Sequence, residues 1–533
     1  MVLFIEFYRI DRHRHHSGIP IRSAAMPPLA ALPGLCALLP PLLMLAALPQ
    51  RPGAAAGWRR FHALAVAALL ASLASLGLQL GLPAATPAAA SPLPGLAAGQ
   101  LGAWVAVLVQ VLGTVIGAVS SRSLEGEPRQ PRFIAALAGV LAAVQLLLLA
   151  DHWLVLIAAW AGVGLALQPL LCFYDDRPFA RLAAHKKRVA DRLADLLLLA
   201  AAGLAWQAVG SGSLPALWQH LATQAASPGL QAAAVCLALA VVLRTALLPV
   251  HGWLLQVMEA PTPVSALLHA GVVNLGGFVL IRFAPLLEAV PAARALLVAL
   301  GLATAVLAGF VMLTRVSIKL RLAWSTVAQM GFMVMECGLG LYTLALLHLL
   351  GHSLYKAQAF LAAAGAVEDT RRRLLRPAVA PSVASLVMAP AGAAALVFGL
   401  AALAPAAWPA WWSGVLALAW APLLWLPATR GPDEPGALRR LLGAAATLAA
   451  LTLAALLGHA LPFGVADAPL AAAGPAVLAG LGALYGGLAL LQARPQALAG
   501  WRRWSYAGFY VDEFATRAAL RLWPTRWMPA ASD

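Results

Sequence analysis

Long runs of apolar residues, separated by short polar connections, dominate the pattern of this chain. Roughly 14 or 15 runs follow one another, each of about 20 residues, the length that crosses a bilayer as an α-helix. The pattern therefore predicts an all-α polytopic membrane protein. The predicted spans are 29–48, 61–82, 97–120, 133–150, 153–173, 190–209, 229–249, 262–282, 292–313, 317–337, 341–366, 379–403, 407–428, 441–460 and 470–491.

Two segments of different composition flank the apolar runs. Residues 1–28 are polar and lead into no signal-peptide cleavage pattern. We interpret them as a loose N-terminal extension or as the product of a misassigned start codon. Residues 29–493 form the predicted transmembrane domain. Residues 494–533 mix aromatic side chains with arginines, which predicts an amphipathic tail in the membrane interface or against a partner.

The composition also indicates a membrane protein, and it changes how the positive net charge is interpreted. The 533 residues are 62% hydrophobic and 11% charged, with a mean hydropathy of +0.83, so too few polar residues exist to cover a soluble globule. The formal net charge is +16. Most Lys and Arg fall in alternate connections, a positive-inside pattern that makes the C-terminal tail cytoplasmic and argues against nucleic-acid binding. The basic connections are 50–60, 121–132, 174–190, 315–321, 368–378 and 430–440.

The four cysteines give no sign of a cofactor. Cys36, Cys172, Cys236 and Cys337 all lie in apolar runs and have no metal-ligand spacing. We therefore expect this chain to bind neither a metal nor another cofactor.

Three ionisable residues share one face of a predicted span. His348, His352 and Lys356 are spaced i, i+4 and i+8, which aligns them along one helix. An ionisable side chain at membrane depth costs about 2.5 to 3.5 kcal/mol, so we interpret this stripe as a proton relay. The alternative is that the histidines only hydrogen-bond neighbouring helices while Lys356 reaches towards the interface.

A second group predicts a broken helix. Arg244 lies within a span and is followed by Pro249 and Gly252, and proline removes a backbone donor and crowds the preceding turn. Pro261 and Pro263 form a turn before the next span begins. Broken helices at membrane depth often lie at transport sites. The alternative is a packing kink in which Arg244 pairs with a carboxylate.

Further polar residues extend this arrangement across several spans. His269 lies within the span that follows the proline turn, and Lys319 begins a segment with a polar stripe. Candidate counter-charges are Asp195, Asp191 and Glu336. Lys319 is also compatible with an interfacial position, and Asp195 with a salt bridge at a helix end. Together these residues favour ion conduction over a substrate pocket.

Four ordered motifs carry a family resemblance. They are PTPVSALLHA (261–270), HAGVVNLGGFVLIR, SIKLRLAWSTVAQMGFM and HLLGHSLYKAQAFL. From about residue 97 to 370 the chain resembles the antiporter-like subunits of respiratory complex I and of Mrp antiporters. The resemblance implies two inverted five-helix repeats with broken helices. It also implies a cation path whose members fall on Asp195, Arg244, His269, Lys319, His348, His352 and Lys356.

Departures from that pattern favour one branch. Ala161 follows Trp160 where the family has a glutamate, Arg244 replaces a lysine, and no charged residue lies between Pro377 and Thr429. With these departures, the retained HAGVVNLGG motif, the short overall length and the absence of a long lateral helix make the chain resemble the DabB branch. That branch comprises the membrane subunits of DAB inorganic-carbon systems. That resemblance implies a bacterial inner-membrane protein that conducts protons or sodium and performs no covalent chemistry itself. It also implies that membrane lipid surrounds the chain. The implied protein partner is a large zinc-containing, DabA-like cytoplasmic subunit that resembles carbonic anhydrase and hydrates CO2 to bicarbonate.

Three alternatives remain open at the level of sequence. They are a proton-translocating subunit of a complex I-like NADH/quinone oxidoreductase, a component of an Mrp-type Na+/H+ antiporter, and a scaffold that conducts nothing.

Overall fold

The computed structural model describes residues 28–49, 53–81, 93–364, 380–428, 436–525 and 527. The predicted N-terminal extension lies outside the described residues, apart from its last residue. Within the described part the regular elements are α-helices and short 3-10 helices, and no β-strand is formed.

The helices follow one another through the whole described chain. The first are α1 (Pro28–Ala46), α2 (Ala54–Gly81), α3 (Gln100–Ser123), α4 (Gln130–Leu149), α5 (Trp153–Leu171), α6 (Pro178–Val209), α7 (Leu214–Thr223) and α8 (Pro228–Arg244). The middle elements are α9 (Gly252–Gln256), η1 (Val257–Glu259), α10 (Thr262–Ala270), η2 (Val272–Asn274), α11 (Leu275–Arg282), α12 (Ala284–Glu288), α13 (Pro291–Leu313), α14 (Ile318–Leu339), α15 (Tyr342–Leu361) and η3 (Ala362–Ala364). The last are α17 (Val383–Ala401), α18 (Ala410–Trp420), η4 (Ala421–Leu424), α19 (Ala437–His459), η5 (Ala471–Ala473), α20 (Gly474–Ala493), α21 (Ala499–Tyr506), η6 (Gly508–Tyr510) and α22 (Val511–Leu522).

These helices confirm an all-α polytopic membrane protein. Each predicted span has a helical counterpart. Within the described ranges, nine helical segments are long and apolar enough to cross a membrane, and three shorter apolar helices accompany them. Helices α6, α14 and α15 are not among the nine, because charged and polar side chains interrupt their apolar surface.

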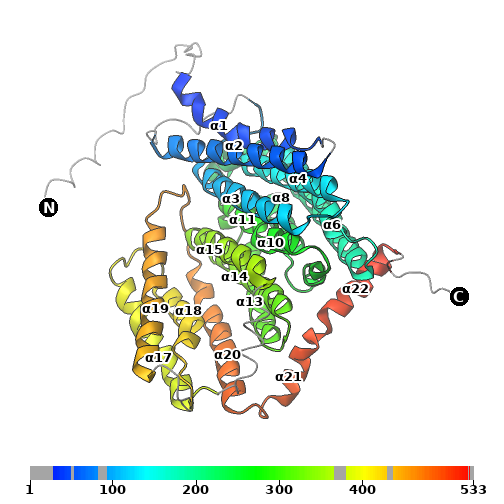
Figure 1. Cartoon of the computed structure of the whole chain (residues 1–533). Helices are drawn as coiled ribbons and strands as arrows, with labels where there is room; N and C mark the ends of the chain where they lie inside the picture. Colours follow the sequence, from blue (N-terminus) through cyan, green and yellow to red (C-terminus); the bar gives the residue numbers. More distant parts are fainter. Residues whose placement is uncertain are drawn as a thin grey trace, which may run out of the picture.

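The bundle has an N-terminal part, a central part and a C-terminal part. Helices α1 to α6 lie on one side and α17 to α20 on the other, with α8, α10, α11 and α13 to α15 between them (Figure 1). One hydrophobic core extends from α1 to α15, and a second joins α13 to α15 with α17 to α20. Of the central helices, α13 to α15 belong to both cores. The buried ionisable residues lie mainly on α6 and on the central helices.

The connections gather at two ends of the bundle, as the charge pattern predicts. We call one end the basic end. It contains the connections 121–132 and 174–190, the 315–321 corner and the tail. Arg129 bonds Asp175 at 2.7 Å, and the guanidinium of Arg315 lies 5.8 Å from the ring centre of Tyr506. At the opposite end, Arg282 pairs with Asp151 at 3.0 Å.

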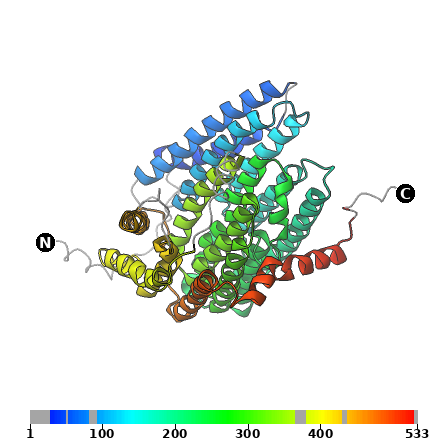
Figure 2. The same cartoon turned by 60° about the horizontal axis from the view of Figure 1, so that its bottom comes forward.

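The C-terminal tail runs along the basic end. Helix α21 packs against α13, and α22 packs against α6 and α9. Figure 1 shows α22 meeting α6, and Figure 2 shows the same tail from below. The tail therefore connects the C-terminal part of the bundle to the helix that carries Asp195.

Candidate functional site

The helix breaks after α8. Arg244 is the last residue of α8, and α9 begins at Gly252. The break starts ahead of Pro249, because Ala246 has a left-handed backbone with φ of 55° and a left-handed residue ends an α-helix. Pro261 precedes the first residue of α10, and Pro263 lies in its first turn, where a missing N–H costs nothing.

The span that follows has an interruption that the apolar pattern of its sequence does not predict. Residues 262–282 are predicted as one continuous span, but α10 ends at Ala270 and a 3-10 turn precedes α11. Gly271, which caps α10, has φ −122° and ψ −72°. A Cβ at this glycine would lie 2.9 Å from the carbonyl oxygen of Leu267. The second break therefore lies two residues after His269.

An ionic cluster fills the space between α6 and the end of α8. We call it the α6–α8 cluster; it consists of Lys186, Lys187, Asp191, Asp195 and Arg244. Arg244 donates one hydrogen bond to Asp195 and a second, of 2.7 Å, to the carbonyl oxygen of Trp160. Lys187 donates to Asp191, one helical turn earlier than Asp195. All five members are buried.

The carboxylate that pairs with Arg244 comes from α6. Asp195 supplies the carboxylate for Arg244 from α6, whereas the family pattern would place a carboxylate at Ala161 on α5. Arg192 also bonds Asp195, at 3.0 Å, from a side chain that is 43% exposed. Asp195 is therefore both the buried counter-charge of Arg244 and part of a helix-surface pair.

Lys356 is held by neutral groups on a neighbouring helix. It is 1% exposed, and it donates to the Ser325 hydroxyl and, at 2.9 Å, to the carbonyl oxygen of Leu322. No carboxylate pairs with it among the described residues. The Lys356 side chain is therefore buried against the N-terminal half of α14.

The two histidines of the stripe have different surroundings. His348 Nδ1 lies 2.7 Å from a carboxylate oxygen of Glu336, while His352 Nε2 lies 3.3 Å from the carbonyl oxygen of His269. Glu336, His348 and His352 line a cavity of about 850 Å³ between α13 to α15 and α18 to α20, together with Ser325 and Gln329. We call these three residues and Lys356 the α14–α15 cluster.

The remaining predicted residues lie next to the α14–α15 cluster. Lys319 donates to the hydroxyl of Thr262 at the start of α10, at 2.9 Å. It is only partly buried and begins α14, which agrees with the interfacial alternative. The His269 ring is fully buried and stacks on Phe360, with ring centres 4.4 Å apart. Both nitrogens of His269 lack a hydrogen-bond partner within the described structure.

Sequence reasoning missed several charged residues. Asp191 and Asp195 were predicted as counter-charges, but Lys187 was not. Lys187 lies four residues before Asp191, so the same i, i+4 spacing could have revealed it. Lys186 pairs with Asp512 of the tail, a contact that no local pattern reveals. At the opposite end Asp467 accepts the backbone N–H of Thr343 at 2.7 Å, and burial raises the pKa of the Asp467 carboxyl.

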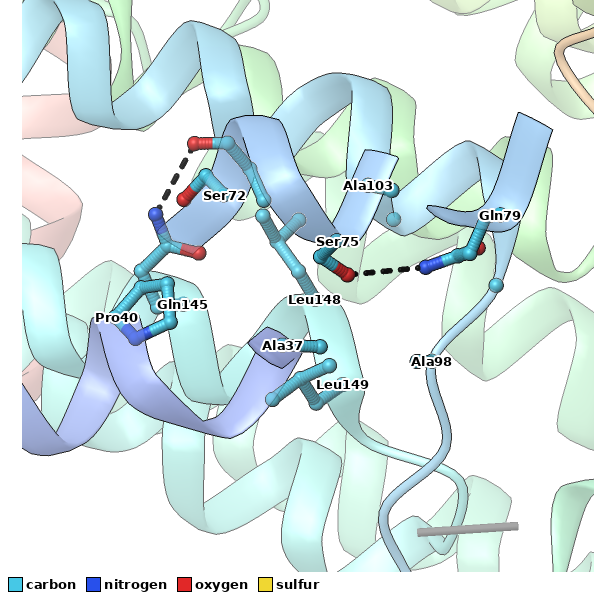
Figure 3. Close-up of a pocket in the computed structure, with 13 residues that line it drawn as sticks. Ala37, Pro40, Ser72, Ser75, Gln79, Ala98, Ala103, Gln145, Leu148 and Leu149 are labelled. Carbon is cyan, nitrogen blue, oxygen red and sulfur yellow. Dashed lines mark hydrogen bonds between the residues drawn. The ribbon is translucent and has the colours of Figure 1, made fainter. Parts of the chain in front are cut away.

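A separate small pocket is not a candidate for this chemistry. It lies between α1, α2, α3 and α4, has a volume of about 10 Å³ and is lined by no charged side chain (Figure 3). Gln79 donates to Ser75 at 3.2 Å, and Gln145 donates to the carbonyl oxygen of Ala106 at 3.1 Å. The pocket holds one water molecule at most.

Comparison with known proteins identifies the family. Residues 150–422 match the transmembrane family of NADH:quinone oxidoreductases and Mrp antiporters. The chain is 41% identical over 403 residues to the probable inorganic carbon transporter subunit DabB of Hydrogenovibrio crunogenus, which covers 74% of this chain and 77% of that protein. It is 46% identical over 259 residues to the probable subunit DabB2 of Halothiobacillus neapolitanus, covering 48% and 47%.

More distant relatives agree with this assignment. NADH-quinone oxidoreductase subunit L of Mycobacterium tuberculosis is 32% identical over 287 residues, covering 52% of this chain and 45% of that protein. Among solved structures, a chain of the Mrp complex from Dietzia sp. DQ12-45-1b has the same fold, with a TM-score of 0.54 and 24% identity over 92% of this chain and 60% of that one. The chain therefore belongs to the DabB family of inorganic carbon transporter subunits, within the membrane family of NADH:quinone oxidoreductases and Mrp antiporters.

Proposed function

We propose that this chain is the cation-conducting membrane subunit of an inorganic carbon uptake complex. A proton or sodium gradient would drive hydration of CO2 to bicarbonate by a large, zinc-dependent cytoplasmic partner resembling carbonic anhydrase. One observation carries the proposal: two clusters of buried ionisable side chains lie around a broken helix in a chain of the DabB family. Such residues are costly in a membrane and mark ion paths.

In the α14–α15 cluster, Lys356 is the residue that exchanges a proton. A buried ammonium without a carboxylate partner is costly, so its proton passes readily to a neighbouring acceptor. His352 and His348 follow on the same face of α15, and a histidine can accept at one ring nitrogen and donate from the other. The cavity beside Glu336 and His348 gives water or a cation access to this line.

In the α6–α8 cluster, the permanent charge of Arg244 has a different role. A guanidinium does not release its proton in a protein, so Arg244 acts as a fixed positive charge that holds Asp195 ionised. A cation that enters near Asp195 competes with Arg244 for the carboxylate. This competition changes the electrostatic balance at the helix break without any deprotonation of Arg244.

Coupling to the partner requires an element with two states that both sites bias. The segment 245–251 between α8 and α9 is our candidate, because it joins Arg244 to the basic end. The positive-inside rule supports a position for the basic end on the cytoplasmic side of a bacterial inner membrane. The partner would bind there, and cation entry would alter its catalytic state while this chain performs no covalent chemistry.

The test is purification of the tagged chain from bacterial membranes, followed by measurement of bicarbonate accumulation in cells. We expect a large zinc-containing subunit to copurify, and we expect ionophores that dissipate the proton and sodium gradients to abolish accumulation. Copurification of flavin or iron–sulfur proteins would instead support a redox complex, and several small membrane subunits would support an Mrp assembly. Accumulation that persists with both gradients dissipated would overturn the proposal.

A further inference from the structure

The C-terminal tail places a carboxylate at the helix break. Asp512 lies in the first turn of α22 and accepts a hydrogen bond of 2.5 Å from Lys186. The Lys186 side chain is 6% exposed and that of Asp512 is 26% exposed. This pair joins residues that are 326 positions apart in the chain, so the tail is a defined part of the ionic region.

Gly252 leaves the space that this carboxylate occupies. A Cβ at Gly252 would lie 1.4 Å from a carboxylate oxygen of Asp512 and 2.3 Å from the nitrogen of Lys186. Any residue other than glycine would therefore displace the carboxylate. Gly252 is the first residue of α9, so Asp512 lies directly against the segment that follows the break.

The turn before α22 holds Asp512 in this position. Gly508, Phe509 and Tyr510 have φ values of 63°, 56° and 56°. A left-handed conformation costs roughly 1–2 kcal/mol at a residue with a side chain. Phe509 packs on Trp501 with ring centres 5.0 Å apart, and Tyr510 packs on Trp504 at 5.8 Å. These contacts stabilise an unfavourable turn whose effect is to direct α22 towards α6.

A buried histidine lies near this carboxylate and packs against α14. His251 immediately precedes Gly252, is fully buried and contacts Trp324 with ring centres 4.8 Å apart. Trp324 neighbours Ser325, which accepts the hydrogen bond from Lys356. No side chain that the structure describes hydrogen-bonds either ring nitrogen of His251, and the backbone of Pro249 interacts with the ring. A buried imidazole can accept a proton at one ring nitrogen and donate a proton from the other.

We propose that Asp512, Lys186 and His251 form a cation-exchange site, which joins the solution at the basic end to the two buried clusters. Asp512 receives or releases the cation, and Lys186 holds the carboxylate when the site is empty. When the cation is a proton, His251 passes it from Asp512 towards Lys356. The tail is thus part of the cation path. This inference rests on the proposed function, because it names the site at which the conducted cation exchanges.

The test measures cation flux through the complete complex in liposomes of phosphatidylethanolamine and phosphatidylglycerol, with an enclosed pH dye and with radiolabelled sodium. Asp512→Asn keeps a hydrogen-bond acceptor for Lys186 but removes the charge, and we expect flux to fall about tenfold or more. Asp512→Glu should recover part of it. Glu513→Gln is the matched control, because Glu513 is exposed on the same turn, and we expect it to conduct like wild type.

Tryptic cleavage at Arg517 and Arg521 reports separately whether the tail is docked. A docked Asp512→Asn tail with wild-type flux would show that Asp512 only fastens the tail, and would overturn the inference. If Asp512→Asn releases the tail, we expect the added substitution Lys186→Gln to restore docking through an amide pair. Wild-type flux through that docked double variant would also overturn the inference. Gly252→Ala should displace the tail and lower flux; wild-type flux with the tail displaced would also overturn the inference.

The same experiment separates this inference from the proposed function. If the wild-type complex transports neither protons nor sodium, the proposed function fails. If the wild type conducts and Lys356→Ala does not, while Asp512→Asn conducts fully, only the inference about the tail fails.

Discussion

Arg244 at the end of α8 and Asp195 on α6 form a buried ion pair, and each has a second partner. Arg244 also bonds the carbonyl oxygen of Trp160, and Asp195 also bonds Arg192. The planar guanidinium reaches two acceptors at once, which a lysine ammonium does with less definite geometry. The pair therefore fixes α5, α6 and α8 around the helix break.

Removing the buried cation should destabilise the protein. Among the described residues, Arg244→Gln leaves the buried Asp195 with the partly exposed Arg192 as its one remaining ion-pair partner. Breaking a buried pair costs about 3–5 kcal/mol. We expect a clear loss of thermal stability for the purified protein in detergent, with a smaller loss for Arg244→Lys. Arg192→Gln is the control, because an exposed pair contributes about 1 kcal/mol or less. Equal losses for Arg244→Gln and Arg192→Gln would contradict the importance of burial.

Replacing Lys356 should abolish transport while preserving the complex. Lys356→Ala removes the only ammonium on the α15 stripe, so we expect loss of bicarbonate accumulation and of carbon-dependent growth in air. Partner binding, measured by copurification, should remain. Tyr355→Phe is the control, because Tyr355 is 60% exposed and phenylalanine keeps the ring that lies 5.8 Å from the Lys356 ammonium. Normal growth in air with Lys356→Ala would contradict conduction through this residue.

Sequence periodicity predicts the spans and the polar stripe well. Spans of about 20 apolar residues have few alternatives in a bilayer, so each predicted span has its helix. The i, i+4 spacing of His348, His352 and Lys356 requires only that the span be helical. A break in this region also follows from local chemistry, because Pro249 and Gly252 disfavour a continuous helix. The helix nevertheless ends earlier than the proline predicts, at Arg244.

What the sequence did not reveal depends on tertiary contacts. The interruption at Gly271 has no proline to signal it. The pairing of Asp195 with Arg244 requires α6 and α8 to pack together, and the pairing of Lys186 with Asp512 requires the tail to return across the basic end. Glu336 was foreseen only as a possible counter-charge, because two consecutive helices must align before it meets His348.

Neutralising Glu336 should impair transport more than stability. Glu336→Gln keeps the size of the side chain and can still hydrogen-bond His348, but it removes the negative charge beside the cavity. We expect bicarbonate accumulation to fall about tenfold or more, while the thermal unfolding temperature changes little. Glu288→Gln is the matched control, because Glu288 is exposed at the opposite end. Full accumulation with Glu336→Gln would exclude this carboxylate from the cation path.

The close contact between α13 and α14 gives a prediction about stability that is independent of transport. A Cβ at Gly301 would lie 2.6 Å from the carbonyl oxygen of Gly331 and 2.7 Å from the backbone nitrogen of Met335. Because these atoms belong to the backbone of the opposing helix, Gly301→Ala must separate α13 from α14, and overpacking of this kind costs about 1–3 kcal/mol. We therefore expect Gly301→Ala to lower the thermal unfolding temperature in detergent. Gly399→Ala makes the same chemical change in α17, where no atom lies within 4 Å of the added Cβ, and it should leave stability unchanged or slightly improved. Equal unfolding temperatures for the two variants would contradict the close approach of α13 and α14.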